Sequence, residues 1–216
     1  RQNLTVSLTM PMIFRLGEHL ARTSVPAELS PEDARSALSA LLRSARILAD
    51  QNGAKGDPPS GIWYRETPER VITIEEQEEA IVRGITGQRE HLVLVATSML
   101  NAFQGEFVAL EVRAYRNPIV YRAGQTVVET RVNGQLSEDR VLQQVNEFLR
   151  VRVREKALAD KMIPVQTDAQ SIGEVSQEDV LALIREIRAA GRQVRVLAIA
   201  LQDTRAADPL KLEFRI

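Results

Sequence analysis

A basic cluster in the second half of the chain is the first group whose residue types and spacing could do chemistry. It comprises Arg150, Arg152, Arg154, Lys156 and Lys161, and the spacing of Arg150 and Arg154 places them on one face of a helix. Guanidinium groups bind carboxylates and phosphates through paired hydrogen bonds. We therefore take Arg150, Arg154 and Lys161 as candidate contacts for an anion or an acidic partner. Positive charge near the C-terminal end of a helix also has a purely structural explanation, which we favour.

The pair Trp63-Tyr64 is the second candidate contact. It follows a loop rich in glycine and proline at residues 53–61, and it is the only aromatic pair outside the predicted core. Aromatic side chains frequently anchor protein partners. The pair is therefore either a partner contact or a device that holds the loop in place.

Two glutamates, Glu111 and Glu213, occupy equivalent positions in a repeated strand pattern. If the two strands met about a pseudo-twofold axis, the carboxylates could form the acid and base of a hydrolase. Each glutamate is followed two residues later by an arginine, so an exposed ion pair of little energetic value is the favoured interpretation.

Cofactor and metal chemistry finds no support in the residue types. The chain has no cysteine and only two histidines, His19 and His91, which are too far apart in sequence to resemble a ligand motif. Lys55 in the 53–61 loop is followed by glycine, aspartate and two prolines, which does not match a phosphate-binding loop. We expect no cofactor, no metal and no enzymatic activity.

Overall charge does not select a partner, because 28 basic residues face 29 acidic ones in 216 residues. No apolar run reaches the roughly 20 residues that span a bilayer, and no signal peptide opens the chain. The first residue is not methionine, so we expect a fragment of a longer protein.

The elements that must position these residues follow an internal repeat. Residues 11–18 match residues 118–125, and residues 93–113 match residues 195–215 without a gap. We therefore predict two units, 1–105 and 106–216, with the strand at 106–115 ending one pattern and beginning the next. Each unit is predicted as a strand, a tight β-hairpin with glycine at its turn, a long helix, a second helix and a closing strand.

Helix boundaries are marked by capping residues. Ser30-Pro31 is typical of a helix start, and Gly53 is placed to end that helix. The other predicted helices start at three hydroxyl residues, Thr73, Ser137 and Ser176, and the last of them ends at Gly191. The runs 91–99 and 194–201 are apolar on both faces, as central strands are.

The predicted fold class is α/β with mixed sheets. Read from His91 to Leu201, the order of elements is that of ribonuclease-H-like folds. Nucleases of that fold hold metal ions with an acid on the first strand, but residues 91–99 contain none. A degenerate, non-catalytic version is the form that the sequence allows.

Three segments carry a resemblance to a known family: His91 to Glu106, Arg116 to Val128, and Asp208 to Glu213. They resemble the bacterial family called domain of unknown function 3084, over nearly the whole chain. The resemblance implies the globular head of a protein with an N-terminal membrane segment and a long coiled coil, the head itself being soluble and cytoplasmic. It implies no catalytic residues.

Two functions of different class follow. The favoured hypothesis is a non-enzymatic interaction or scaffolding head whose partner is another protein or a second copy of itself, with membrane attachment only through a segment outside these residues. The alternative is a nucleic-acid-binding module on a degenerate ribonuclease-H-like fold that uses the Arg150 to Lys161 cluster.

Overall fold

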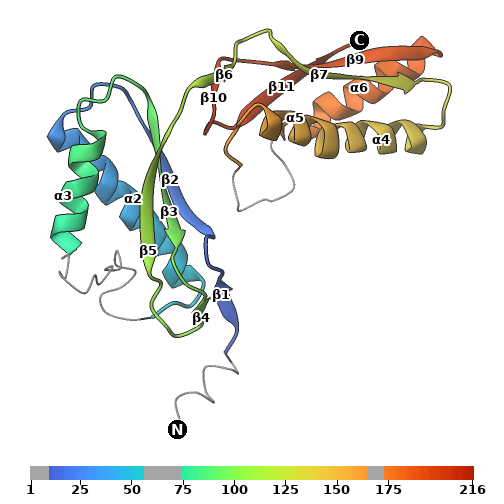
Figure 1. The fold of residues 1–216 in the computed structure, drawn as a ribbon. Helices are drawn as coiled ribbons and strands as arrows, with labels where there is room; N and C mark the ends of the chain where they lie inside the picture. The colour runs from blue at the N-terminus through green and yellow to red at the C-terminus, as the bar shows by residue number, and fades with distance from the viewer. Residues whose placement is uncertain (1–9, 56–73, 165–172) are drawn as a thin grey trace. The chain divides into compact units, whose positions relative to one another are not determined.

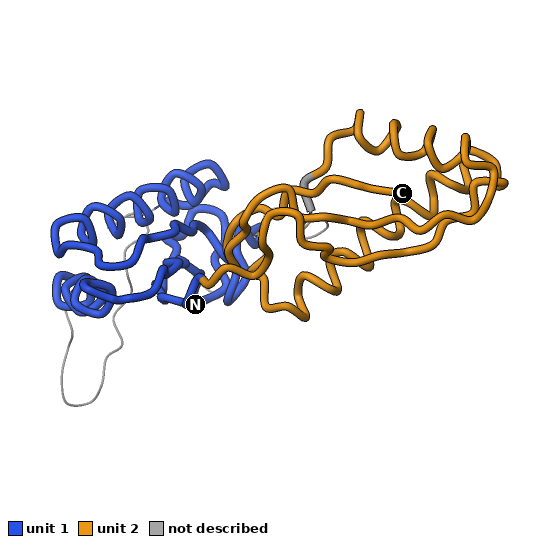
Figure 2. The backbone as a smooth tube through the Cα atoms, turned by 90° about the horizontal axis from the view of Figure 1, so that it is seen from above, with its two compact units in different colours: residues 1–117 blue, residues 118–216 orange. Residues whose placement is uncertain are grey.

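The chain folds into two compact units, residues 1–117 and 118–216, in a computed structural model that describes residues 10–55, 74–164 and 173–216 (Figure 2). The division falls after strand β5 (Leu110–Arg116) rather than at the 105/106 boundary that the repeat predicted. The reason is that β5 pairs along its length with β3 of the first unit.

The first unit is a three-stranded antiparallel sheet with two helices (Figure 1). Its elements in chain order are β1 (Met12–Phe14), β2 (His19–Val25), α2 (Pro31–Gln51), α3 (Ile74–Ile85), β3 (Leu92–Ser98), β4 (Ala102–Phe103) and β5. The sheet order is β2-β3-β5, and alternate residues of β3 such as Leu94 and Ala96 pack against the buried side chains of α2. One face of the sheet is therefore covered by helices.

The predicted glycine hairpin is wrong in one respect, because β1 and β2 do not pair with each other. β1 pairs with β4, and β2 pairs with β3, so residues 12–25 run beside residues 92–103 as one antiparallel ribbon. The turn at Gly17, whose φ is +80°, interrupts this ribbon as a local bulge, and its N–H donates to the Ser98 carbonyl at 2.7 Å. Gly17 adopts a positive φ, as expected of a turn glycine, but β1 and β2 continue in line instead of folding back on each other.

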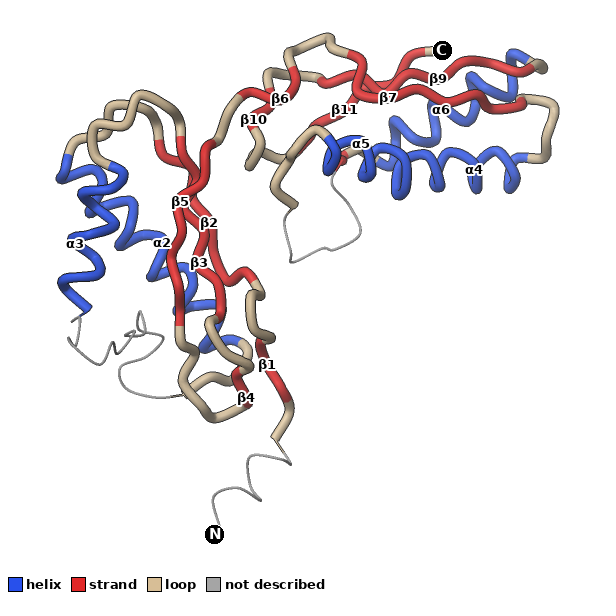
Figure 3. Tube along the Cα trace, viewed as in Figure 1, coloured by secondary structure: helices blue, strands red, loops and turns tan. Residues whose placement is uncertain are grey.

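The second unit has a four-stranded sheet, in the order β7-β9-β11-β8 (Figure 3). Its elements are β6 (Ile119–Tyr121), β7 (Thr126–Asn133), α4 (Glu138–Glu147), the π-helical turn η1 (Phe148–Val153), α5 (Arg154–Ala159), β8 (Gly173–Glu174), α6 (Gln177–Ala190), β9 (Gln193–Ala200), β10 (Thr204–Arg205) and β11 (Leu210–Arg215). The short β8 pairs parallel to β11, and the other pairs are antiparallel. β6 pairs with β10, so here too the strands flanking the glycine turn do not form a hairpin.

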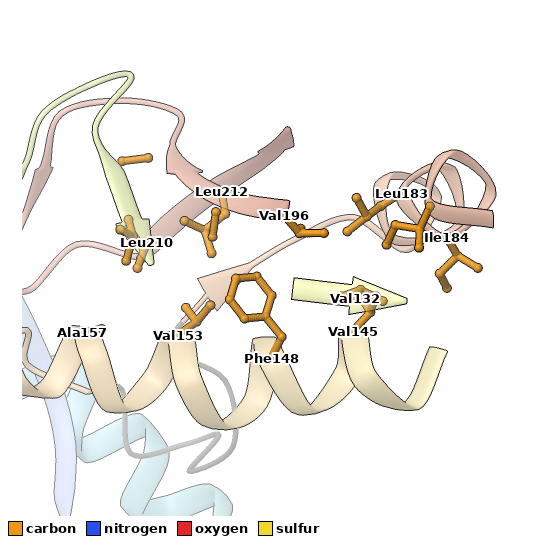
Figure 4. Close-up of a cluster of buried hydrophobic side chains, with 14 of the residues drawn as sticks. Val132, Val145, Phe148, Val153, Ala157, Leu183, Ile184, Val196, Leu210 and Leu212 are labelled. Carbon is orange, nitrogen blue, oxygen red and sulfur yellow. The ribbon is translucent and has the colours of Figure 1, made fainter. Parts of the chain in front are cut away.

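The core of the second unit lies between this sheet and the continuous helical stretch α4-η1-α5 (Figure 4). Phe148 and Val153 point from the helix toward Val196 and Leu212 of the sheet, and Leu183 of α6 closes one end. Phe148 and Val153 are five residues apart, which a regular α-helix could not place on one face. The π-helical turn takes up the extra residue and keeps both in the core.

Helix starts agree with the capping signals where the structure describes them. The hydroxyls of Ser30 and Ser176 each accept a hydrogen bond from the backbone N–H three residues later, at 3.1 and 3.0 Å. Ser137 precedes α4 without such a bond, and α6 ends at Gly191 with φ of 58°. Thr73 lies outside the described residues.

The ribonuclease-H-like order of elements does not correspond to one sheet in the described residues. β3 and β5 belong to the sheet of the first unit, whereas β7 and β9 pair with each other in the second. The physical reason is that the apolar stretch 92–98 pairs with β2, a strand that precedes His91 in the chain. The class, mixed α and β, is as predicted.

Candidate interaction surface

The basic cluster lies on the outer surface of the helical stretch in the second unit. Arg150 is exposed in the π-helical turn, and Arg154, the first residue of α5, is half-buried. Neither guanidinium has an ion-pair partner within the described residues. Arg152 donates to the Thr130 hydroxyl at 3.3 Å and so joins the helix to β7.

Lys161, the third predicted contact of this cluster, has a backbone role. Its φ is +68°, a left-handed conformation that ends α5, and the next N–H, of Met162, bonds back to the Ala157 carbonyl at 2.9 Å. Gly53 holds the same place after α2, with φ of +87°. The position is explained by helix termination, whatever its side chain binds.

Lys156 belongs to a group that the sequence did not reveal. Its ammonium contacts both carboxylate oxygens of Asp160 at 2.6 Å, and the hydroxyl of buried Tyr121 donates to the same carboxylate at 2.7 Å. Burial alone would raise the pKa of Asp160, but the hydrogen bonds from Lys156 and Tyr121 outweigh it and lower that pKa. Burial, and then the bond to Asp160, raises the pKa of Tyr121 far above its usual value. The phenol therefore stays neutral and joins β6 to the end of α5.

The two glutamates considered as a hydrolase pair are each engaged locally. Glu111 pairs with Arg113 at 2.9 Å, and Glu213 pairs with Arg215 at 2.6 Å. Glu111 lies on β5 of the first unit and Glu213 on β11 of the second, so no described strand pair joins the two glutamates. The favoured interpretation, an exposed ion pair, describes both.

No group of three or more histidines, aspartates or glutamates that could hold a metal ion occurs in the described part of the chain. His19 begins β2, where burial and then Arg22 lower its pKa. The aromatic candidates Trp63 and Tyr64 lie outside the described residues.

An edge strand is the feature that residue types alone did not indicate. β7 is the first strand of the four-stranded sheet, and among the described residues it pairs only with β9. Its exposed face carries Glu129 and Arg131, which lie across the ladder from Leu197 and Arg195. Arg195 bonds the Glu129 carboxylate through both Nε and Nη2. Arg131 is thus left opposite a like charge and has no ion-pair partner among the described residues.

The fold defines a two-unit α/β protein with helices on one face of each sheet. Residues 121–216 match the family model described as the DUF3084-associated C-terminal helical hairpin, a match that supports the resemblance to the DUF3084 family. In the structure the helices of that segment, α4 to α5 and α6, contact each other and pack on the four-stranded sheet. No curated protein and no solved structure matches the chain.

Among the helices in the described ranges, none combines the length and hydrophobicity that crossing a bilayer requires.

Proposed function

We propose that the chain is a non-enzymatic interaction module that joins protein molecules. The observation that carries the proposal is β7, an eight-residue strand without proline that, among the described residues, pairs only with β9. Exposed edges invite pairing with another chain, and proteins usually shorten, bend or cover them. A long, unshortened edge of this kind favours a role in association.

Light scattering after size exclusion tests the proposal on the whole chain over a range of protein and salt concentrations. We expect a mass above that of one chain, or a stoichiometric complex with a purified protein partner. A chain that stays monomeric and binds no protein in either setting would overturn the proposal.

The proposal includes internal duplication, which the strand registers support. In the first unit Arg22 lies opposite Val95, and Glu111 lies opposite Thr97. In the second, Glu129 lies opposite Leu197, and Glu213 lies opposite Ile199, at the positions that the sequence repeat equates with the first set. The bulges also correspond, because the Gly124 N–H donates to the Ala200 carbonyl at 2.8 Å as Gly17 does to Ser98.

The setting of the module is part of the same proposal. The family resemblance implies a bacterial, membrane-tethered coiled coil in front of this head, which would bring heads together and raise their local concentration. Cell fractionation of the full-length protein with an antibody to this head tests it. Recovery in the membrane fraction that detergent, but not salt, releases is the expected result.

Nucleic-acid binding is the second candidate function, favoured by Arg150 and Arg154, which have no ion-pair partner within the described residues. An anisotropy titration against single-stranded, duplex and branched DNA at two salt concentrations is the test. If the two arginines contact phosphates, replacing both with alanine should reduce the slope of log affinity against log salt by about 2. Undetectable binding at low salt would end this candidate.

A further inference from the structure

The outer edge of β7 has a defined set of free backbone groups. The ladder with β9 is bounded by two bonds, Gly134 N–H to the Arg192 carbonyl at 3.0 Å and Ala200 N–H to the Gln125 carbonyl at 2.9 Å. Bonded pairs alternate along an antiparallel ladder, so the residues bonded to β9 between these ends are Val132, Thr130 and Val128. The backbone N–H and C=O groups of Glu129 and Arg131 therefore point away from the sheet, toward the free edge.

These groups allow only a few registers for antiparallel pairing of β7 with β7 of a second copy. Outward-facing residues must pair with outward-facing residues, which leaves three central choices. Two of them set like charges against each other, Glu129 against Glu129 or Arg131 against Arg131. In the third, each Glu129 lies opposite the second copy's Arg131, and the twofold axis passes between the two Thr130 residues.

The third register also compensates the positive charge of Arg131, which has no carboxylate partner among the described residues of its own chain. Arg131 lies opposite Arg195 in the ladder, while Glu129 is already bonded to Arg195. A second copy supplies Arg131 with the carboxylate that its own chain does not place beside it. The same register puts Val128 opposite the second copy's Val132, so the face that carries the core remains apolar or neutral along the seam.

We propose that the chain self-associates edge to edge through β7, with Glu129 opposite the second copy's Arg131, to join two four-stranded sheets into one of eight strands. The proposal deepens the proposed interaction function and rests on it. Arg152 bonds Thr130 close to the axis, so the like charge of its two copies opposes pairing. The favourable free energy of the two Glu129–Arg131 pairs and of the added backbone hydrogen bonds must exceed that repulsion. The resulting self-association is therefore weak and sensitive to salt.

Charge reversal tests the register on the whole chain by sedimentation equilibrium. Glu129→Arg and Arg131→Glu each set like charges along the seam, and each should weaken self-association at least tenfold. An equimolar mixture of the two variants should form a mixed dimer, because every pair across the seam is then opposite in charge. Arg113→Glu is the control. It reverses the charge of an exposed, ion-paired arginine in the other unit and should leave self-association unchanged.

Arg131→Pro tests the backbone bonds separately from charge. Its N–H faces the free edge, so proline should block strand addition while the ladder to β9 survives, with an unchanged far-ultraviolet circular dichroism spectrum. Loss of self-association in this folded variant is expected.

The outcomes separate this inference from the proposed function. A native oligomer that all β7 variants preserve, or single variants that fail to combine when mixed, overturns the β7 seam and leaves the interaction function standing. A native chain that is monomeric but binds a different purified protein also overturns self-pairing alone. A monomer that binds no protein overturns both.

Discussion

Lys161 shows how a surface cation can be fixed by the backbone alone. A non-glycine residue in the left-handed region costs roughly 1–2 kcal/mol, and Lys161 has φ of +68° where α5 ends. We expect Lys161→Gly to raise the free energy of unfolding by about 0.5–1 kcal/mol, part of the relief being offset by the greater flexibility of glycine in the unfolded chain. Urea-induced unfolding followed by circular dichroism measures the change.

The reverse substitution at the equivalent place is the matched control. Gly53→Lys places a side chain at φ of +87° with its Cβ 3.2 Å from the Cγ of Gln104, so it should destabilise the first unit by at least that amount. Destabilisation by Lys161→Gly would show that the lysine side chain stabilises the fold more than its backbone strain costs.

Tyr121 ties β6 to α5 through a charge-assisted hydrogen bond, which predicts a pH-dependent contribution. Tyr121→Phe removes one donor to Asp160, and we expect a loss of about 1–2 kcal/mol at pH 7. The pKa of Asp160 is below its ordinary value in the fold, so its stabilising contribution is fully present above about pH 4 and is lost as pH falls through the folded pKa. The difference between native and variant should therefore shrink in acid.

Urea unfolding of both proteins at neutral pH and at about pH 2.5 checks the sign. Phe14 stands at the equivalent position of the first unit, so the ring itself is accommodated without a hydroxyl there. An equal difference at the two pH values would contradict the assignment of the effect to the Asp160 carboxylate.

At the scale of elements, the sequence predicted the features that depend on a few neighbouring residues, such as helix starts and turns. Ser30 and Ser176 cap their helices through bonds to the third residue, and that pattern is contained in a few neighbouring positions. The glycine at position 17 predicted a turn correctly, but not that the flanking strands continue in line. Which strand a segment joins depends on residues far along the chain, such as Ala102 and Phe103, and no local pattern contains that choice.

The π-helical turn is a second such case, and it yields a prediction. The buried positions of α2 and of α4-η1-α5 follow the same spacing until the latter inserts one residue between Phe148 and Val153. Deleting exposed Val151 should restore regular α-helical spacing with a change in the free energy of unfolding of no more than about 1 kcal/mol. Circular dichroism and urea unfolding provide the measurement.

Deletion of exposed Ile47 in α2 is the control, because that helix has no extra residue. It rotates buried Ala49 and the end of the helix away from the core, so a loss above about 2 kcal/mol is expected. Equal losses from the two deletions would mean that the π-helical turn is not an insertion that the core tolerates.

At the scale of the molecule, the candidate surface was only partly predictable. The arginine cluster is visible in sequence, because charge and helical spacing are local. The β7 edge is not visible in sequence, since Glu129 and Arg131 resemble any exposed polar strand face. Only the strand pairing shows that Arg195 binds Glu129 and lies opposite Arg131. Within the described part of the chain, one edge of β7 is free because only β9 pairs with this strand.

The two hydrophobic cores share no residue, which predicts independent local stability. One core draws its buried side chains from residues 14–110 and the other from residues 121–212. Leu41→Ala removes a fully buried side chain from the first core and should cost about 2–5 kcal/mol there. Hydrogen exchange of the intact chain, followed by mass spectrometry, should then speed up in β2, β3 and β5 but not in β7, β9 and β11.

Phe148→Ala is the reciprocal variant, with an expected loss of about 3–5 kcal/mol confined to the second unit. Each variant serves as the control for the other, because a general loss of the fold would speed up exchange in both units rather than in one. Faster exchange in both units from either substitution would show that the units unfold together. Confinement of each effect means that self-association through β7 would protect the amides of the second unit alone, a pattern that the same exchange measurement reads directly.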